Sequence, residues 1–415
     1  MLVHWQGNLT GIQRVEYNLA RRFALKPDVK FCLFDKTRKM FTEYDFNLVK
    51  AKVEILAQAQ SMQALEVTTP SGQARYINYL RKTIGPLLPA PTKRKAKSLF
   101  WHSKRLMRPK EVERAPRFFP QDKMLILSGD WSDNIFATAV ANVKTTEKIK
   151  VFLVVYDMLP AVQPAFFVPG MSEQFSSYMK SIFKICDGIL AISESTKKDI
   201  ELFQDKKKLP KPALKVFRLG EDFVDKTPIK PRTSIEPGGF LLAVGTIEAR
   251  KNHQALYYMV REALKRGIEL PPIVIAGKRG WLVDSLLYLV EKDEAVRKRI
   301  IFLHSSTDQE IAWLFQNCLL TLYPSFYEGW GLPIAESLYY GKLCLSSNSS
   351  SMPEIAGDLI DYYSPNDPGT MLKVIAKYLD NPELLKKKEK QIKENYRLTS
   401  WDDTFKQVEE FILNH

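Results

Sequence analysis

Residues 323–341, Y-P-S-F-Y-E-G-W-G-L-P-I-A-E-S-L-Y-Y-G, decide how the rest of the 415-residue chain is interpreted. Two carboxylates, Glu328 and Glu336, lie eight positions apart, with two glycines and Pro333 between them. Proline is tolerated in a first helical turn and glycines allow close backbone approach, so the stretch predicts a loop that turns into a helix. We expect Glu328 in the loop and Glu336 in the first helical turn, beside free amides that attract anions. The stretch therefore predicts a phosphate site.

The composition is that of a globular chain long enough for two domains, with 45% hydrophobic residues. The four cysteines form no close pairs, which argues against a zinc or disulfide framework and fits a reduced cytoplasmic compartment. The first residues, M-L-V-H-W-Q-G-N, do not have the pattern of a signal peptide. Residues 151–171 approach the length of a membrane span, but Asp157 and three prolines favour a strand followed by a loop.

The net charge of +14 favours a polyanionic partner such as nucleic acid, anionic lipid or a phosphorylated substrate. Twelve Lys or Arg residues lie in segment 81–117, against only Glu111 and Glu113. A solvated insertion and contact with an anionic membrane surface explain this segment equally well. Nucleic-acid binding is disfavoured, because the sequence has no zinc-finger spacing, no aromatic RNA-binding signature and no basic helix with heptads.

The chain begins with a strand pattern at residues 2–5, a loop ending in T-G-I and a helical pattern. Gly11 at this turn either lets the backbone approach a ligand or is an ordinary turn glycine. Few residues precede it, so the first strand is short and a truncated start is an alternative. Residues 29–34 predict another strand, after which the α/β alternation fades until about residue 122, as expected for an insertion at about 36–120.

Short apolar runs typical of buried parallel strands follow at residues 124–128, 151–156 and 188–193. Asp157 comes at the carboxyl end of the second run, where ligands bind in open α/β sheets, although an aspartate there also caps turns. Ser193 and Ser195 precede a helical pattern and are interpreted as helix caps first and ligand contacts second.

Residues 225–239 combine three prolines with a pair of glycines and predict a linker between domains. A second strand–helix series follows, with strands predicted at residues 240–244, 272–276, 300–303, 319–323 and 342–346. The sequence therefore predicts two doubly wound, Rossmann-like α/β domains that face each other across a cleft.

Adjacent positive charges, Arg250 and Lys251, follow a Gly-Thr turn in this second series. An arginine grips phosphate oxygens with two hydrogen bonds, and a neighbouring lysine adds a compact charge. The alternative is a solvated pair at a helix start, where positive charge is unfavourable against the helix dipole. Lys278, in A-G-K-R-G-W, contacts a nucleotide or is a surface lysine.

The segments V-G-T-I-E-A-R-K-N-H and L-Y-P-S-F-Y-E-G-W-G-L-P-I-A-E-S resemble the donor site of the family 4 glycosyltransferases, retaining enzymes of the GT-B fold. The segments T-G-I-Q-R-V-E, V-V-Y-D-M-L-P and I-L-A-I-S-E-S-T-K-K-D-I are similar to bacterial members that build surface polysaccharides, especially mannosyltransferase-like ones. The resemblance implies an acceptor-binding domain at residues 1–228 and a donor-binding domain at 229–399. It also implies a C-terminal helix at 400–415 that packs back onto the first domain.

The resemblance also assigns roles to individual residues. Arg250 and Lys251 hold the donor diphosphate, Glu328 reaches the donor sugar, and Asp157 is an acceptor-side contact or auxiliary base. The remaining donor contacts that it implies are Gly11, Gly245, Thr246, Lys278, Gly329, Gly331, Leu332 and Glu336. Weaker acceptor-side candidates are Arg14, Trp131 and Tyr156, the last of which stands where many relatives have a histidine.

Other classes of enzyme fit the sequence less well. A glycosidase needs two carboxyl groups around the scissile bond, which conflicts with the placement of Glu328 and Glu336 beside a phosphate site. A dinucleotide-dependent oxidoreductase is disfavoured because the Gly11 loop lacks the three-glycine fingerprint. No paired-aspartate motif convincing enough to hold a metal is present, so we expect neither metal nor cofactor.

The expected function is that of a metal-independent, retaining glycosyltransferase that moves a hexose, with mannose from GDP-mannose favoured. The expected acceptor is a lipid-linked or polysaccharide glycan of a bacterial surface, and the expected location is cytoplasmic or peripheral on the inner face of the membrane. The alternatives are a UDP-, dTDP- or ADP-sugar donor and a nucleotide-sugar-binding scaffold without turnover.

Overall fold

The computed structural model describes residues 11–51, 53, 115–129, 131–221, 227–231 and 233–415. The chain divides into two compact units, Met1–Arg117 and Phe118–His415. The strand predicted at residues 2–5 and the basic segment at 81–114 lie outside the described residues.

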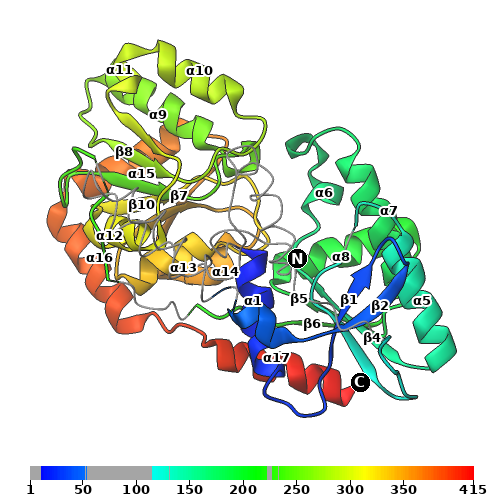
Figure 1. The fold of residues 1–415 in the computed structure, drawn as a ribbon. Coiled ribbons are helices and arrows are strands. Elements are labelled where there is room, and N and C mark those ends of the chain that lie inside the picture. The colour runs from blue at the N-terminus through cyan, green and yellow to red at the C-terminus, as the bar shows by residue number, and fades with distance from the viewer. Residues whose placement is uncertain (1–10, 52, 54–114, 130, 222–226, 232) are drawn as a thin grey trace, which may run out of the picture. The chain divides into compact units, whose positions relative to one another are not determined.

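The first unit contains helix α1 (Ile12–Phe23) and a hairpin of β1 (Phe31–Asp35) and β2 (Met40–Tyr44), shown in blue in Figure 1. The strand predicted at residues 29–34 is present as β1, and among the residues that the structure describes it forms a two-stranded antiparallel sheet with β2. Four residues join the two strands, which suffices for a hairpin but not for a parallel crossover. Phe46 stacks on Phe31 at 4.9 Å between ring centroids and lies 6.1 Å from Tyr17 of α1.

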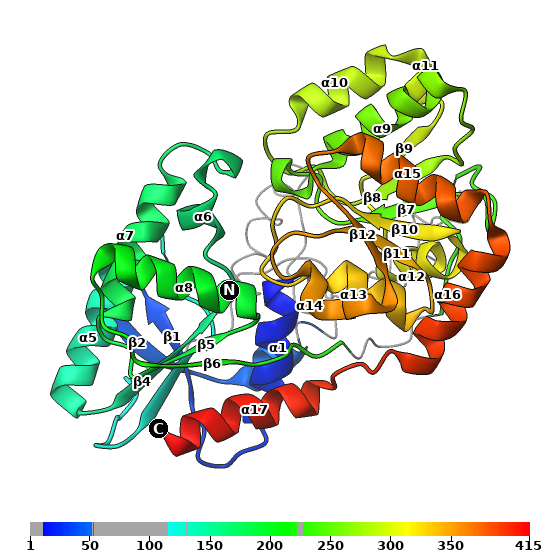
Figure 2. The same cartoon turned by 180° about the vertical axis from the view of Figure 1, so that it is seen from behind.

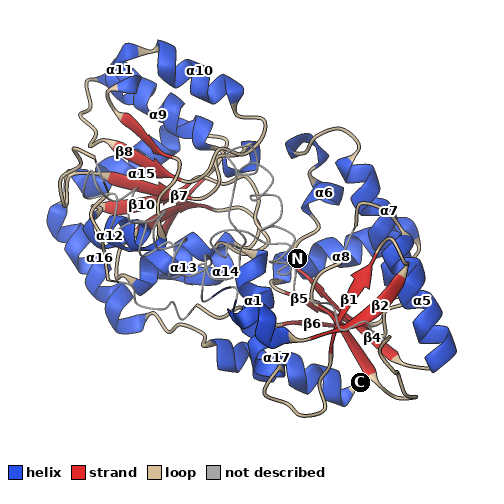
Figure 3. Cartoon of the chain, in the orientation of Figure 1, coloured by secondary structure: helices blue, strands red, loops and turns tan. Residues whose placement is uncertain are grey.

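The described residues of the second unit form two sheets, whose strands are drawn in red in Figure 3. Every pair of neighbouring strands in these two sheets is parallel. The α/β fold class expected from the sequence is thus confirmed. All eight runs predicted as strands between residues 124 and 346 are present, whereas β6 and β12 were not predicted. The first sheet has the order β3 (Lys123–Ile126), β4 (Lys150–Val155), β5 (Gly188–Ala191), β6 (Ala213–Val216), and the second β12 (Asp361–Tyr363), β11 (Cys344–Ser347), β10 (Leu320–Tyr323), β7 (Leu241–Val244), β8 (Ile273–Ala276), β9 (Ile300–Leu303).

Helices and short 3₁₀ turns connect these strands. They are α5 (Ile135–Glu147), α6 (Leu159–Val162), η3 (Pro164–Phe166), α7 (Met171–Phe183), α8 (Glu194–Lys207), η4 (Ala249–Lys251), α9 (His253–Arg266), α10 (Asp284–Lys292), α11 (Glu294–Arg297), α12 (Asp308–Asn317), α13 (Leu332–Tyr339), α14 (Met352–Ala356), η5 (Gly357–Leu359), α15 (Pro368–Leu379), α16 (Pro382–Asn395) and α17 (Trp401–Asn414).

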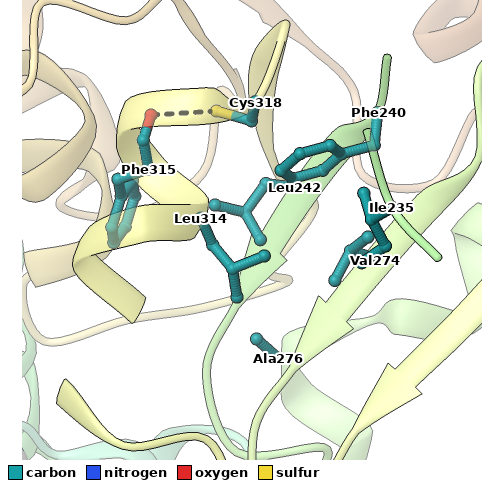
Figure 4. Close-up of a cluster of buried hydrophobic side chains, with 8 residues drawn as sticks. All are labelled: Ile235, Phe240, Leu242, Val274, Ala276, Leu314, Phe315 and Cys318. Atoms are coloured by element: carbon teal, nitrogen blue, oxygen red, sulfur yellow. Dashed lines mark hydrogen bonds between the residues drawn. The ribbon is translucent and has the colours of Figure 1, made fainter. Parts of the chain in front are cut away.

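The cores follow from strands that are buried on both faces. Strands β5, β8, β10 and β11 are buried along their whole length, as expected for parallel strands covered by helices. In the second sheet Leu242 of β7 and Val274 of β8 pack with Leu314 of α12 (Figure 4). Burying a side chain of this size stabilises the fold by roughly 1.5–3 kcal/mol.

Helix α17 packs against the first sheet, although it follows the second sheet in the sequence (Figure 2). The Lys123 ammonium donates to the carbonyl oxygens of Ile412 and Leu413 at 2.6 and 2.9 Å. The ring of Phe411 meets Phe152 of β4 edge to face, with 6.0 Å between centroids. The domain boundary predicted at 228/229 falls between the two sheets and inside the second unit, and the division into two functional domains stays a prediction.

Among the described residues, no helix has the length and apolar character needed to cross a membrane.

Candidate functional site

Two loops that follow neighbouring strands form the candidate site. The loop after β7 contains η4, and the loop after β10 leads into α13. Strands β7 and β10 pair in parallel, so both loops leave the same edge of the sheet. The backbone N–H of Phe326 donates to the carbonyl of Arg250 at 2.8 Å and ties the two loops together. The sequence segments that carry the predicted diphosphate and sugar contacts are therefore adjacent in space.

A buried carboxylate, that of Glu328, pairs with two cations at this edge. Its Oε1 lies 2.7 Å from Lys251 Nζ, and its Oε2 contacts Arg250 Nη1. Arg250 also pairs through Nε with Glu248 Oε1 at 2.6 Å. Only 7% of the Glu328 side chain and 10% of the Lys251 side chain are exposed, so these pairs are shielded from solvent. The structure thus brings together the three residues with the strongest predicted roles and adds Glu248, which the sequence analysis missed.

The pKa values of these groups show which protonation states the cluster favours. Burial alone would raise the pKa of the Glu328 carboxyl, but the guanidinium of Arg250 and the ammonium of Lys251 outweigh it and lower this pKa to about 2. Burial also lowers the pKa of the Lys251 ammonium, which Glu328 opposes. Burial raises the pKa of Glu248, and Arg250 opposes that shift. Of the two carboxylates that contact Arg250, those of Glu248 and Glu328, the Glu328 carboxylate is therefore the firmly ionised one.

Serine hydroxyls hold the loop that carries Glu328. The N–H of Glu328 donates to Ser350 Oγ at 2.9 Å, and Ser351 Oγ donates to the carbonyls of Glu328 and Trp330 at 2.9 and 2.7 Å. Ser351 is completely buried, so these contacts fix the backbone on both sides of Gly329. The run N-S-S-S-M-P at residues 348–353 is the sequence signal that points to this support.

Two further buried groups surround Lys251. Its ammonium donates to Tyr323 Oη at 2.7 Å, and Tyr323 ends strand β10. His253, at the start of α9, is only 3% exposed, and its Nδ1 has no hydrogen-bond partner among the described residues. Burial, reinforced by the charge of Lys251, lowers the pKa of His253 to about 3. His253 is consequently neutral near pH 7 and adds no charge to the cluster.

Tyr156 and Asp157, which directly follow β4 of the first sheet, meet the loop that carries Glu328 at Gly329. A Cβ on Gly329 would lie 2.1 Å from the carbonyl oxygen of Tyr156, so only glycine permits this approach. Asp157 Oδ1 accepts a hydrogen bond from the N–H of Leu159 at 3.0 Å, which is the turn-capping role. Burial raises the pKa of Asp157, whereas the charge of Arg250 lowers it. Asp157 thus caps a turn and also lies within the electrostatic reach of the cluster.

A second connection links helix α8 to the same region. Tyr327 Oη donates to Asp199 Oδ2 at 2.7 Å, and the Glu354 carboxylate accepts from the N–H groups of Glu194 and Ser195 at 2.8 Å each. Ser193 caps α8 as predicted, because its hydroxyl accepts from the N–H of Thr196. Sequence reasoning missed Asp199, Tyr327 and Glu354, whose partners lie more than a hundred residues away in the chain.

The other predicted donor contacts follow the ends of β7, β8 and β10. Gly245 and the exposed Thr246 follow β7, and the exposed Lys278 follows β8. Gly331 precedes α13 with φ 157°, and Leu332 is the first residue of that helix. The prediction that Glu336 lies in the first turn is wrong: α13 begins at Leu332, and its first turn contains no acidic residue.

The weaker acceptor-side candidates lie in different surroundings. Trp131 packs edge to face on Phe175 of α7, with 5.7 Å between ring centroids. Gly11 and Arg14 belong to the first unit, at the start of α1, and their roles stay predictions. Within the described part of the chain, no group of three His, Cys, Asp or Glu residues is placed to hold a metal ion.

The part of the chain that carries both loops of the site also matches a known protein family. The family model described as "Glycosyl transferases group 1" matches residues 225–398, which include both loops of the site. The "Serotype-specific mannosyltransferase WbdA" of Escherichia coli is 24% identical over 72% of this chain and 38% of its own length. The "O-antigen chain mannosyltransferase B" of E. coli is 34% identical over 34% of this chain and 36% of its own length. The chain thus spans less than half of these relatives.

Solved structures with a similar fold are glycosyltransferases. HepE of Anabaena, in complex with UDP-glucose, superposes with a TM-score of 0.54 at 12% identity and covers 71% of this chain and 79% of its own. Sucrose-phosphate synthase of Thermosynechococcus elongatus gives a TM-score of 0.52 at 15% identity over 79% of this chain and 81% of its own. Residues 225–398 therefore form a group 1 glycosyltransferase domain, in a chain with the parallel-sheet α/β fold of the GT-B glycosyltransferases.

Proposed function

We propose that this chain is a retaining, metal-independent glycosyltransferase that moves mannose from GDP-mannose onto a glycan acceptor. The observation that carries the proposal is the buried contact of Glu328 with Arg250 and Lys251, inside the group 1 glycosyltransferase domain. The E. coli relatives named as mannosyltransferases support the choice of sugar. The O-antigen chain in the name of the second relative supports a lipid-linked or polysaccharide acceptor of bacterial O-antigen or capsule synthesis.

The proposed chemistry asks the cluster to stabilise a departing nucleoside diphosphate. As the bond between the sugar C1 and the phosphate oxygen breaks, its electron pair stays on the phosphate, and negative charge grows there. Preorganised cations in a site shielded from water stabilise that charge, which is the role of Arg250 and Lys251. The acceptor hydroxyl oxygen forms the new bond to C1 from the same face, and its proton passes to the leaving phosphate.

Glu328 has a positioning role in this proposal. Its carboxylate fixes the two cations before the donor arrives, and it accepts hydrogen bonds from hydroxyl groups of the donor sugar. Glu336 holds the nucleotide ribose from α13, and the amides of Gly329, Gly331 and Leu332 complete the donor site. Asp157 faces the acceptor side as a contact or auxiliary base. No step of this scheme requires a metal ion or a resident cofactor.

The direct experiment is sugar transfer with purified protein, separate GDP-, UDP-, dTDP- and ADP-sugar donors and a mannose-terminated acceptor. We expect transfer from GDP-mannose with retention of the anomeric configuration, seen by NMR of the product. Transfer from a different donor would replace the GDP-mannose assignment. Donor binding, seen as a raised unfolding midpoint, without transfer to any acceptor would favour a scaffold subunit.

Location is the remaining part of the proposal. We propose a cytoplasmic protein whose basic segment at 81–117 contacts the anionic inner face of the membrane, where a lipid-linked acceptor resides. Replacing Lys93, Arg94, Lys95 and Lys97 by glutamine should weaken sedimentation with anionic liposomes. Unchanged binding would remove the membrane contact from the proposal and leave the transfer chemistry untouched.

A further inference from the structure

Two neighbouring hollows lie beside the candidate site. The inner one, of about 450 Å³, is lined by Glu248 and Ala249, directly before Arg250, and by Phe326, two residues before Glu328. The outer one, of about 470 Å³, continues along α9 toward Lys265. Tyr258 and Pro368 line both hollows, so the two hollows adjoin and are together called the groove. Its inner end reaches Glu248, which pairs with Arg250. Each hollow has the volume of an ordinary ligand pocket, which is roughly 300–1,000 Å³.

The walls of this groove combine aromatic faces with hydrogen-bonding groups. Phe166 and Phe326 stack at 5.4 Å between ring centroids at the inner end. Tyr258 is 47% exposed where the hollows meet, and its hydroxyl accepts from Gln254 Nε2 at 3.2 Å. His253, which is 3% exposed, also lines the inner hollow. Its Nδ1 has no hydrogen-bond partner among the described residues, so it can bond to a hydroxyl of a bound sugar. Aromatic faces beside amide and imidazole groups suit sugar rings, which offer C–H faces and hydroxyls.

The donor nucleotide does not account for the groove. The described residues predicted to contact the donor, from Gly245 and Lys278 to Glu336, line neither hollow. The far end, with Arg261, Glu262 and Lys265, carries charges of both signs and suits a neutral chain better than a diphosphate.

We propose that this groove holds the sugar units of the acceptor that precede the one receiving the new sugar, so that the preferred acceptor is a glycan of several units. The inference rests on the proposed function and names its acceptor class. The inner hollow holds the units next to the reaction, with Phe166 and Phe326 as their apolar wall. Tyr258 stacks on a unit further from the reacting end.

The test compares a mannose disaccharide with a longer mannose oligosaccharide as acceptors for the wild-type protein and three variants. Tyr258→Ala removes the ring at the centre of the groove, and Tyr258→Phe retains it. The matched control is Tyr288→Ala, because Tyr288 is 62% exposed on α10 and lines neither hollow. A ring contact of this kind changes affinity by roughly three- to tenfold.

We expect Tyr258→Ala to raise KM for the longer acceptor by about three- to tenfold, with an unchanged KM for the disaccharide and for the donor. Tyr258→Phe should restore most of the loss, and Tyr288→Ala should behave as wild type. Equal KM values for both acceptor lengths in wild type and Tyr258→Ala would overturn the inference, as would a change in donor KM alone.

A second variant blocks the groove instead of removing a contact. Asn366 is exposed and lines the inner hollow, so Asn366→Trp adds bulk there with little risk to folding. We expect weaker binding of the longer oligosaccharide, measured by calorimetry in the absence of donor, and unchanged binding of GDP-mannose. Unchanged oligosaccharide binding would contradict the inference. Absence of transfer by the wild-type protein with every donor and acceptor would instead contradict the proposed function, so the two failures are distinct.

Discussion

Lys251 Nζ and Glu328 Oε1 lie 2.7 Å apart in a buried contact between the loops that follow β7 and β10. The pair joins residues that are far apart in the chain but leave one edge of a parallel sheet. Because Arg250 contacts the other oxygen of Glu328, the protein itself orients the two cations, as their proposed role toward a diphosphate requires. Such preorganisation lowers a barrier, since the groups need not reorganise as charge develops.

Removing the carboxylate should weaken the fold as well as the reaction. Glu328→Gln leaves Lys251 buried without its carboxylate, and breaking a buried ion pair from one side costs about 3–5 kcal/mol. We expect the urea midpoint to fall accordingly. Glu291→Gln is the control, because Glu291 is an exposed partner of Lys292 and solvent screens that pair, so its loss should leave the midpoint nearly unchanged. Equal midpoints for the two variants would show that the Glu328 pair contributes no stability.

The buried His253 should make stability depend on pH. Its folded pKa of about 3 lies below its ordinary 6.5, so between these values the unfolded chain binds a proton that the folded chain does not. The stability that neutral His253 contributes is therefore fully present above pH 6.5 and is lost as pH falls toward 3, with a slope of up to about 1.4 kcal/mol per pH unit.

His253→Gln removes this titration and is the matched variant. Between pH 6.5 and 4.5, a window above the ordinary pKa of 4.5 for glutamate, the unfolding free energy of the wild type should fall more steeply than that of the variant. Parallel curves would mean that His253 is not held neutral.

The packing of α17 can be tested through one close contact. A Cβ on Gly220 would lie 2.3 Å from Trp401 Cδ2, so Gly220→Ala should destabilise the protein by about 1–3 kcal/mol. In the Trp401→Ala background the same substitution should cost much less, because the clashing ring is gone. Gly239→Ala is the control, since its Cβ would meet nothing closer than 3.4 Å. A Gly220→Ala cost that is the same in both backgrounds would contradict this packing.

Sequence patterns predicted the parts of the fold that depend on local order. Apolar runs such as residues 272–276 became buried parallel strands because both faces of such strands are covered. The half-buried β6 and the three-residue β12 were missed, since neither has a long apolar run. The apolar run near residue 31 predicts β1, but the connection K-T-R-K to β2 contains no glycine or asparagine that would mark a hairpin turn, so the sequence does not predict the antiparallel partner.

The candidate site was predictable where the motif residues make the contacts themselves, as Arg250, Lys251 and Glu328 do. Pro333 correctly indicates the start of α13, but it does not fix the first helical residue. Because α13 already begins at Leu332, Glu336 lies beyond its first turn. Glu248 and Asp199 act through partners that only the folded chain brings close, so nothing in their local sequence identifies them.

In the proposed function, Lys251 stabilises the departing diphosphate during transfer from GDP-mannose. Lys251→Met keeps the aliphatic stem and removes the charge, and the rate constant kcat for mannose transfer measures the consequence. We predict a fall of about 10²–10³-fold in kcat, as for the loss of one preorganised electrostatic group, in a variant that calorimetry shows to be folded and to bind the longer oligosaccharide. A folded Lys251→Met variant that transfers mannose at the wild-type rate would show that the Lys251 charge does not stabilise the departing diphosphate.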